Sequence, residues 1–554
     1  MNRAPSTDDR PFNLDSVDGV LIGPGLERLQ LLLISYLPRQ RWFGAKSRTI
    51  KAVEVLDSTE FPGLNAVLLF LQITHDDGST SVYHLALALV TGEEAARVHA
   101  SNPAGIVSTV TTPAGPAILC DAVAREPVRQ AVLNLIESNG ELRTQAGVLH
   151  GRRSSAFAAI RGVDPLPART GSAEQSNTSI FYGDKFILKL FRRLQPGENP
   201  DTEIGRFLTE TAHFTQIAPF LGDIILSRSG NPTGESTTVA MLQGLVRNEG
   251  DGWQWTLDQL ARYYESVADL PPPDDLGASA SFLASPASFL VSPEPPPLAR
   301  EHSGPYLDAA ALLGRRSAEM HLALATPTDN PAFAAEPFTV EDLYADASRI
   351  DTQLSLSLDA LQRGLPRLTG VAADSAARVL SWRVELSARA QAIASANSTG
   401  FGQRIRIHGD YHLGQVLRSR GDFVILDFEG EPAKSLAERR AKQSPLRDVA
   451  GMLRSFSYAA YAALNAFTTQ GSEDAKNLED WATRWQNAVS TEFLRAYGLT
   501  IAATNPHLIP QPEQVQRMLN AYLLEKALYE LLYELDNRPT WVRIPLAGIL
   551  ALPQ

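Results

Sequence analysis

The sequence predicts an α+β protein that is rich in strands in its N-terminal part and mainly helical in its C-terminal part. Apolar stretches at 50–57, 64–74 and 81–90 alternate with polar residues, which is typical of strands. Beyond Asp251, apolar residues instead recur at three- and four-residue spacing, as on the buried face of a helix. The change of period predicts two structurally different parts of one chain.

Single elements follow from the same patterns. We expect helices at 26–37 and 126–138, strands at 149–160 and 181–191, and a buried strand at 238–246. The C-terminal helices are expected at 253–268, 305–324, 338–363, 372–396, 436–468, 474–497 and 512–535. No repeat with a period of about 20 to 50 residues is apparent, which excludes solenoids and propellers.

Composition along the chain predicts the domain boundaries. The polar segment 1–18, rich in Asp, Ser and Pro, is expected to be a disordered N-terminus. An N-terminal cap with an intermediate subdomain is expected over 19–144, a small β-rich lobe over 145–246, and a large helical lobe over 247–554. Within the helical lobe, the proline-rich segment 270–300 is expected to be a mobile insertion without regular structure.

Charge and cysteine content exclude several classes of protein. The net charge of −12 and the isoelectric point near 5.4 argue against binding to nucleic acid or to an anionic membrane. A single cysteine, Cys120, rules out an intramolecular disulfide framework and a cysteine-ligated zinc site. The apolar run 29–37 is too short to span a membrane. We therefore expect a cytoplasmic protein that acts on small neutral molecules.

The strongest chemical signal is the loop His408-Gly409-Asp410. Asp410 and Gln415 are five residues apart, the separation between the base and the metal-binding amide in a kinase catalytic loop. Asp427 then stands at the Asp of the D-F-G motif. Phosphoryl transfer from ATP needs a carboxylate beside the attacking hydroxyl and hard oxygen ligands for Mg²⁺. We predict that Asp410 is the catalytic base and that Gln415 and Asp427 hold Mg²⁺.

Two other interpretations of this loop are open. It could be a surface hairpin with acidic residues placed by chance. His408 and His412 could form a metal pair, but Gly409 disfavours a helix and no Glu follows His408 as it does in H-E-x-x-H. Asp448, at the start of an apolar helix, is expected to cap that helix or to anchor the loop.

A second group of candidate residues lies upstream and suggests a nucleotide site. Lys189 interrupts an otherwise apolar strand, and Glu203 follows in a helix that Asn199 and Pro200 open. This pair matches the strand lysine and helix glutamate that align the phosphates of ATP in kinases. The alternative for Lys189 is a strand residue whose ammonium group reaches solvent along its own aliphatic stem.

The loop 170–179 stands where a phosphate-covering loop is required, but it lacks G-x-G-x-x-G. Ser176 and Asn177 are expected to replace its glycines. The strand 238–246 is expected to end at an inter-lobe hinge, where Gln243 and Leu245 would meet adenine. An ordinary buried strand is the alternative. Taken together, the motifs predict a bilobal, protein kinase-like fold.

Several further motifs carry a family resemblance: residues 37–46 (Leu-Pro-Arg-Gln-Arg-Trp-Phe-Gly-Ala-Lys), 174–178, 248–253, 313–321, 408–415 and 537–541. Together they resemble the bacterial maltokinases, relatives of the aminoglycoside phosphotransferases with a eukaryotic protein kinase-like fold. The resemblance implies a cap domain fused to the small lobe, dependence on ATP and Mg²⁺, and conversion of maltose to maltose 1-phosphate for α-glucan (glycogen) synthesis. It also allows an association with trehalose synthase, which makes maltose.

The acceptor site is expected on the helix at 521–536, which places Lys526, Glu530 and Tyr533 on one face. Such polar and aromatic groups bind sugars, and His412 is expected to join them from the catalytic loop. A solvated face with an ion pair is the alternative.

Three other functions are also to be weighed against the sequence. A related kinase for glucosamine or an aminoglycoside would need an acidic acceptor pocket, because a protonated amine requires a carboxylate. A non-catalytic nucleotide- or carbohydrate-binding regulator would be expected to have lost one of the kinase residues. A scaffold organised by the proline-rich segment would not explain the His408-Gly409-Asp410 loop.

Overall fold

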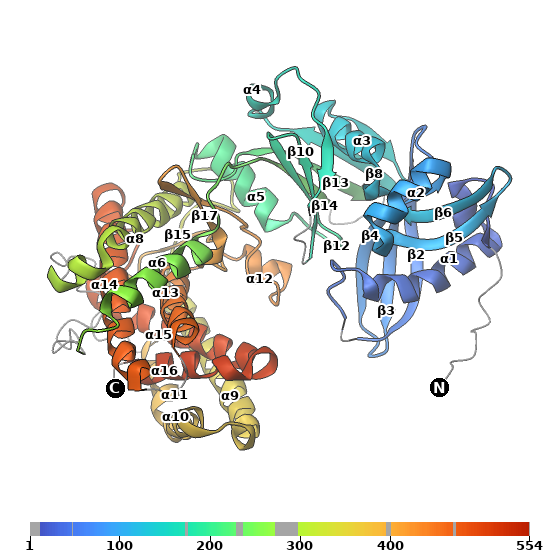
Figure 1. Cartoon of the computed structure of the whole chain (residues 1–554). Coiled ribbons are helices and arrows are strands. Elements are labelled where there is room, and N and C mark those ends of the chain that lie inside the picture. Colours follow the sequence, from blue (N-terminus) through green and yellow to red (C-terminus); the bar gives the residue numbers. More distant parts are fainter. Residues whose placement is uncertain are drawn as a thin grey trace. The chain divides into compact units, whose positions relative to one another are not determined.

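The computed structural model describes residues 12–46, 48–171, 176–228, 236–271, 297–394, 400–468 and 473–552. The chain forms two compact units (Figure 1). The N-terminal unit runs to Glu210 and includes Ala218–Val246. The C-terminal unit consists of Thr211–Ile217 and Arg247–Gln554. Each unit has its own architecture and is described separately.

Two seven-stranded sheets build the N-terminal unit. The cap sheet has the order β1-β5-β6-β4-β3-β2, with β12 paired to β4, and the second sheet has the order β7-β8-β13-β14-β11-β10-β9. The strands are β1 (Phe12–Asn13), β2 (Ile50–Phe61), β3 (Ala66–His75), β4 (Thr80–Thr91), β5 (Ile106–Thr112), β6 (Gly115–Asp121), β7 (Glu141–Arg143), β8 (Gly147–Arg153), β9 (Ala168–Thr170), β10 (Thr178–Tyr182), β11 (Phe186–Leu190), β12 (Arg193–Leu194), β13 (Phe220–Arg228) and β14 (Thr237–Gly244). The helices are α1 (Gly23–Tyr36), α2 (Gly92–Ser101), α3 (Glu126–Glu137), α4 (Phe157–Arg161) and α5 (Pro200–Arg206).

The cap sheet is buried on both faces, and β3 shows why. Val67 and Leu69 pack into a core that also contains residues of α1, whereas Leu68 and Phe70 pack into a second core. Successive side chains of a strand point to opposite faces, so a strand covered on both sides must be apolar throughout. The second core also contains Leu188 of β11, so the two sheets of this unit share one core.

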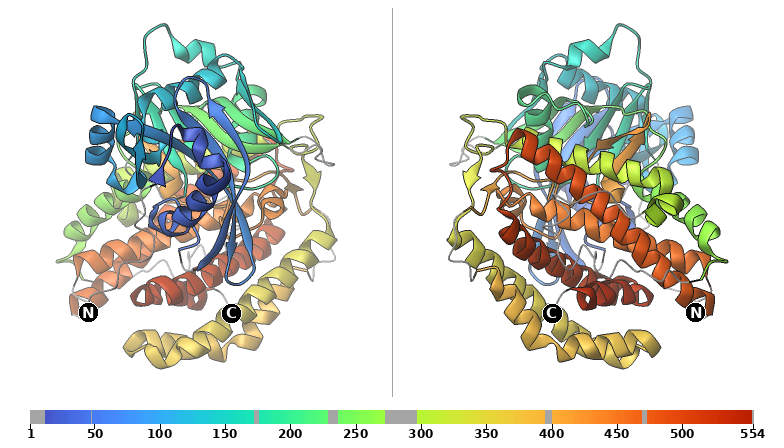
Figure 2. Two further views of the ribbon diagram at one scale, coloured as in Figure 1. Left: turned by 90° about the vertical axis from the view of Figure 1, so that its right-hand side faces the viewer. Right: turned by 90° about the vertical axis from the view of Figure 1, so that its left-hand side faces the viewer.

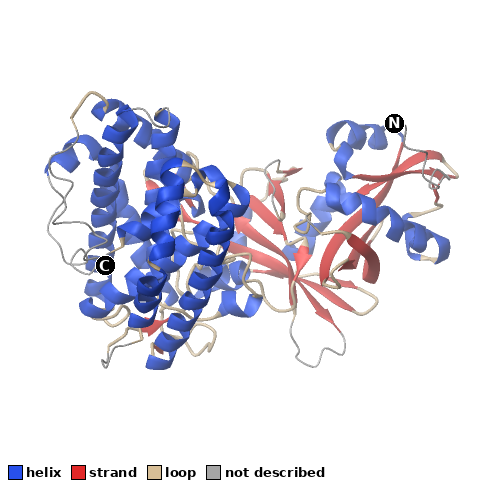
Figure 3. Cartoon of the chain, turned by 90° about the horizontal axis from the view of Figure 1, so that it is seen from below, coloured by secondary structure: helices blue, strands red, loops and turns tan. Residues whose placement is uncertain are grey.

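Helices dominate the C-terminal unit (Figure 3). They are α6 (Gly252–Val267), α8 (Pro297–Leu324), α9 (Val340–Gly364), α10 (Gly370–Ser381), α11 (Arg383–Ala392), α12 (Leu436–Arg440), α13 (Leu446–Phe467), α14 (Glu473–Thr504), α15 (Pro512–Asn537) and α16 (Arg543–Ala551). Two small hairpins accompany them: β15 (Glu336–Pro337) with β16 (Gln403–Arg404), and β17 (Val416–Ser419) with β18 (Asp422–Ile425). Figure 2 shows the long helices from two sides. Within the described ranges, no helix is long and apolar enough to cross a membrane.

The α+β fold class and the strands β2, β3 and β4 confirm the sequence-based expectation. The segment 149–160 was expected to be one strand, which is wrong beyond Arg153. The chain leaves the sheet there and forms α4, whose Phe157 is buried in the core. The segment 436–468 was expected to be one helix, but it divides into α12 and α13. Residue Pro445 stands just before α13, and Gln443 pairs with Ile405 instead of continuing a helix.

Two expected irregular segments are only partly described. Residues 12–18 were expected to be disordered, yet β1 pairs with β5 because Phe12 and Leu14 are buried in the cap core. Most of the expected insertion at 270–300 lies outside the described residues. Its last part is helical, since α8 begins at Pro297.

Gly314 of α8 provides a test of the helical packing. A Cβ atom at this position would collide with the backbone carbonyl of Phe493 in α14, because the two helices approach closely there. We expect Gly314→Ala to lower the free energy of unfolding by about 1–3 kcal/mol, the usual cost of overpacking. Chemical denaturation measures this change. The exposed neighbour Arg315 supplies the control, since Arg315→Ala should change it by less than about 0.5 kcal/mol. A Gly314→Ala variant as stable as the parent would show that the helices are not in tight contact.

Candidate functional site

The His408-Gly409-Asp410 loop enters a short 3-10 turn at Leu413–Gln415 and continues into β17. Gly409 has a φ of +83°, in the left-handed region that favours glycine. A Cβ atom there would also lie 3.3 Å from the Cα atom of Gly430, which is on the loop after β18. The glycine is therefore required both by the turn and by the close approach of two loops.

Asp448, in the first turn of α13, anchors this loop. Its Oδ2 accepts the backbone N–H of His408 at 2.8 Å, and its Oδ1 accepts that of Gly409 at 2.9 Å. The His408 ring contacts the residue just after β18, with Nε2 lying 2.9 Å from the carbonyl oxygen of Leu426. These contacts confirm the expected role of Asp448 as a loop anchor and tie the loop to the segment that carries Asp427.

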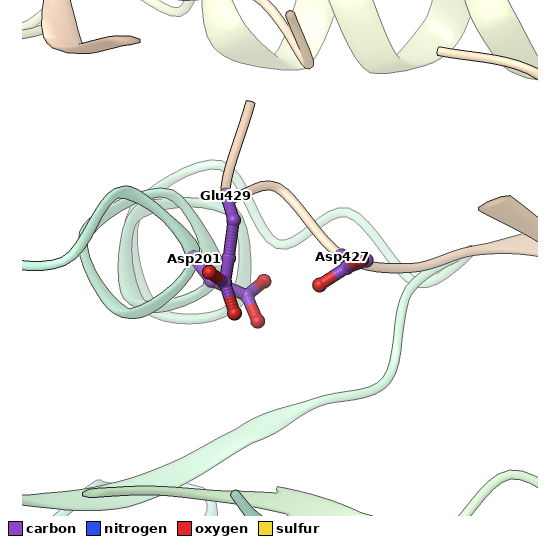
Figure 4. A group of neighbouring side chains, drawn as sticks. All are labelled: Asp201, Asp427 and Glu429. Carbon is purple, nitrogen blue, oxygen red and sulfur yellow. The ribbon is translucent and has the colours of Figure 1, made fainter. Parts of the chain in front are cut away.

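The two predicted metal ligands lie together. The side-chain amide of Gln415 is 3.2 Å from Oδ2 of Asp427, and Asp427 adopts a positive φ of 67° that turns the chain sharply after β18. Glu429 lies two residues further on the same loop (Figure 4), and carboxylate oxygens of Asp427 and Glu429 are within 4.8 Å of each other. Amide and carboxylate oxygens are the ligands that Mg²⁺ prefers, so this set of donors fits a magnesium ion.

Asp410 forms an ion pair with Lys526 of α15. The Lys526 Nζ is 3.2 Å from Oδ1 of Asp410 and 3.2 Å from Oε1 of Glu431. Burial alone would raise the pKa of the Asp410 carboxyl, but the charge of Lys526, with a smaller effect of His412, outweighs it and holds the pKa below its usual range. For Lys526, burial lowers the pKa, but Asp410 and Glu431 outweigh it and raise the pKa above its usual value. Asp410 is therefore ionised near neutral pH.

A cavity of about 280 Å³ opens beside Asp410 within the C-terminal unit, near the lower end of the usual size for a small-ligand site. Charged side chains, aromatic rings and backbone of the loop form its wall. The lining residues are Arg349, Gln353, Ile407, Gly409, Asp410, Tyr411, Glu431, Ala433, Lys434, Glu438, Gln443, Arg447, Asp448, Gly451, Tyr522, Glu525, Lys526 and Tyr529.

The carboxylates of this cavity wall already have partners. Glu431 forms ion pairs with both Lys526 and Lys434. The Nζ of Lys434 is 2.7 Å from Oε2 of Glu431. Glu525 pairs with Arg349 and with Arg447, whose Nη1 is 2.8 Å from Oε2 of Glu525. Each negative charge at these positions is thus balanced by a cation of the protein.

Glu438 and Asp448 complete the set of lining carboxylates. Glu438 forms a capping box with Ser435, accepting its backbone N–H at 2.8 Å. Asp448 is engaged by the loop and by His321 of α8 at 3.0 Å. Every carboxylate that lines the cavity therefore has a donor or a cation within the protein.

Three of the predicted acceptor residues lie elsewhere. Glu530 binds Arg454, with Nη2 at 2.7 Å, and neither Glu530 nor Tyr533 is among the residues that line the cavity. Tyr533 is 48% exposed and lies beside Arg538. His412 lies near the base, with Nε2 4.0 Å from Oδ2 of Asp410, but it does not line the cavity either.

Lys526 alone of the predicted set on α15 faces the cavity, together with Tyr522, Glu525 and Tyr529. The residues of α15 that line the cavity thus start about one helical turn before the residues that helical spacing predicted for the acceptor site. Glu530 instead contacts Arg454 of α13.

In the N-terminal unit, Lys189 lies on β11 with its Nζ 2.7 Å from Oδ2 of Asp201. Asp201 is in the first turn of α5 (Figure 4), which Asn199 caps by accepting the Asp201 N–H at 2.8 Å. The predicted partner Glu203 is buried in the same helix, 6% exposed, and its pairing with Lys189 stays a prediction. Sequence reasoning missed Asp201, although its place just after a first-turn proline could have suggested it.

The other predicted nucleotide residues lie at strand ends. Ser176 and Asn177 precede β10, and Ser176 is exposed. Gln243 is in β14 opposite Ile187 of β11. The backbone N–H of Leu245 donates to the carbonyl of Lys185 at 2.7 Å, so it already has a partner within the sheet.

Residues 36–124 match the maltokinase N-terminal cap domain. This match begins at the end of α1 and takes in β2 to β6, so the cap is the sheet that shares its core with the second sheet of the N-terminal unit.

Over most of its length, the chain is similar to glucosamine kinases. It is 24% identical to the glucosamine kinase of Streptacidiphilus jiangxiensis over 479 residues, which covers 83% of this chain and 94% of that protein. It is also 24% identical to the one from Mycolicibacterium smegmatis over 398 residues, covering 71% and 80%. A solved glucosamine kinase in complex with glucosamine, ADP and inorganic phosphate aligns with a TM-score of 0.59 at 19% identity, covering 91% and 94%. That likeness shows a common fold.

Lys526 provides a test of the electrostatics at Asp410. In Lys526→Met, burial of Asp410 would no longer be opposed by the ammonium group, so its pKa should rise and a higher pH should be needed to ionise it. The ¹³C shift of the Asp410 carboxyl, assigned by its loss in Asp410→Asn, measures this pKa. Tyr533→Phe on the same helix should leave the pKa unchanged. An unchanged or lower pKa in Lys526→Met would contradict the assigned ion pair.

Proposed function

We propose that this protein is an ATP-dependent sugar kinase whose acceptor is maltose and whose product is maltose 1-phosphate. One observation carries the choice of a neutral sugar: each carboxylate in the wall of the cavity beside Asp410 already accepts an ion pair or hydrogen bonds from within the protein. The cap domain adds support, since it matches that of maltokinases.

The charge of the cavity separates a neutral sugar from an amino sugar. A protonated amine needs a carboxylate of its own, because an ammonium group that loses water without gaining a partner is costly. Glu431 and Glu525, the obvious candidates, are each shared between two cations. Hydroxyl groups can instead bond to Lys434, Arg349 and the carboxylate edges, and Tyr529 offers an aromatic face for a sugar ring.

Asp410 is the proposed base. Its depressed pKa keeps it ionised, so its carboxylate can accept the proton of the acceptor hydroxyl as that oxygen attacks the γ-phosphorus of ATP and the bond from this phosphorus to the departing ADP breaks. Lys526 holds the carboxylate in place. Lys189, steadied by Asp201, is proposed to contact the ATP phosphates. Gln415 and Asp427 would hold Mg²⁺, with Glu429 beside them, and the ion would neutralise charge on the phosphates.

A glucosamine kinase is the second candidate, favoured by the activity named for the relatives at 24% identity. A role in glycogen synthesis and an association with trehalose synthase follow only from the resemblance to maltokinases, and they stay predictions. The two candidate acceptors differ in a property that can be measured directly.

A sugar panel tests the acceptor. With ATP and Mg²⁺, maltose should support ADP release with a kcat/KM at least about tenfold above that of glucosamine, because the carboxylates of the cavity wall already have donors or cations that the ammonium of glucosamine would have to displace. NMR of the product should place the phosphate on C1. If glucosamine is preferred, the acceptor assignment is wrong although the kinase assignment stands.

Asp410→Asn tests the reaction itself. The amide keeps the size of the side chain but cannot take the proton, so kcat should fall by about 10²–10⁴-fold, while ATP binding measured by calorimetry stays within about twofold. Tyr533→Phe serves as the control with parental activity. Full activity in Asp410→Asn would refute Asp410 as the base, and a parent that turns over no sugar would favour the non-catalytic regulator.

A further inference from the structure

A fully buried polar chain lies behind the His408-Gly409-Asp410 loop. His321 of α8 has no exposed surface, and Asp448 of α13 is 2% exposed. The Nε2 of His321 lies 3.0 Å from Oδ2 of Asp448, and its Nδ1 lies 2.9 Å from the hydroxyl of Tyr497 in α14. The helix α8 thus meets the distant helices α13 and α14 at one imidazole ring.

The ionised Asp448 fixes the position of one proton on His321. Burial would raise the pKa of Asp448, but hydrogen bonds to its carboxylate, foremost the one from His321, outweigh it and keep the pKa below its usual range. An ionised carboxylate only accepts hydrogen bonds, so Nε2 of His321 must carry a hydrogen. Burial raises the pKa of Tyr497 well above its usual value, so its O–H persists and can donate to Nδ1 of His321. The side chains of Asp448, His321 and Tyr497 thus all have hydrogen-bond partners within the protein.

Asp448 connects His321 to both loops of the candidate site. It accepts the N–H groups of His408 and Gly409, the two residues directly before Asp410. The His408 ring in turn lies 2.9 Å from the Leu426 carbonyl, directly before Asp427. A rotation of the Asp448 carboxylate would therefore displace Asp410 and Asp427 together.

We infer that His321 is a positioning residue: by donating its Nε2–H to Asp448, it sets the orientation of the carboxylate that holds the loop presenting Asp410. His321 touches neither substrate nor metal in this account, and its effect on turnover rests on the proposed function of Asp410. The alternative is that His321 only fills space between α8, α13 and α14.

Two substitutions separate these possibilities. His321→Leu fills the space but removes the donor, whereas His321→Gln can place an amide N–H where Nε2 was. We expect His321→Leu to lower kcat by about 10²-fold, the usual cost of a small displacement of reacting groups, with KM for ATP and sugar within about twofold. His321→Gln should recover most of kcat. Met320→Leu, a volume-conserving change at the adjacent buried residue, should match the parent.

Hydrogen exchange of peptides covering 405–412 gives a readout that does not need the proposed activity. His321→Leu should exchange these amides faster than the parent, and His321→Gln should restore protection. Parental kcat and protection in His321→Leu, or equal loss in both variants, would overturn the inference. If His321→Leu does not fold, Tyr497→Phe, which removes only the hydroxyl that orients the ring, should still lower kcat and protection severalfold. Protection changes without turnover of any sugar would show that the proposed function, not this inference, has failed.

Discussion

The buried carboxylate of Asp448 is the constraint on which the candidate site depends. An ionised group without water must be satisfied by the protein, and here two backbone amides and one imidazole satisfy it. That requirement dictates the path of the loop, which turns at Gly409 with a positive φ. It also brings α13 against the loop, where a Cβ atom on Gly451 would lie 2.6 Å from the Tyr411 carbonyl oxygen.

From this fixed loop, Asp410 projects to Lys526, and Lys526 links it to Glu431. Ion pairs continue along the cavity wall, where Arg447 contacts Glu525. Such a wall orients hydroxyl groups through many donors and acceptors, with five carboxylates and four Lys or Arg side chains among the lining residues. The chemistry of the cavity therefore follows from how its carboxylates are engaged by cations and by hydrogen-bond donors of the protein.

The fold could be predicted largely from periodicity. β3 and the long helices are apolar at regular spacing, and burial on a sheet face or helix stripe leaves that pattern in the sequence. Boundaries were less predictable where local chemistry overrides the pattern. Pro445 and the pairing of Gln443 with Ile405 divide a stretch that reads as one helix. Phe157 falls in an apolar stretch that indicates a strand, but it lies in the short helix α4 and is buried there.

The site could be predicted where its residues are close in sequence. Asp410, Gln415 and Asp427 lie on one loop and one hairpin, so their spacing indicated their proximity. The cavity wall is different, since Arg349, Arg447 and Glu525 come from three helices and their pairing depends on packing. Helical spacing indicated α15 for the acceptor residues, and α15 does contribute to the cavity wall. It could not show that Glu530 contacts Arg454 of α13. It also could not show that Lys526, one turn earlier on α15, lines the cavity.

A crystal structure of the protein with ADP, Mg²⁺ and maltose would show whether the acceptor lies at Asp410. We expect the C1 hydroxyl of maltose within hydrogen-bond distance of Asp410, its rings against Tyr529 and the Glu525–Arg447 pair, and Mg²⁺ between Gln415 and Asp427. Maltose bound away from Asp410, or Mg²⁺ held without Asp427, would contradict this expectation.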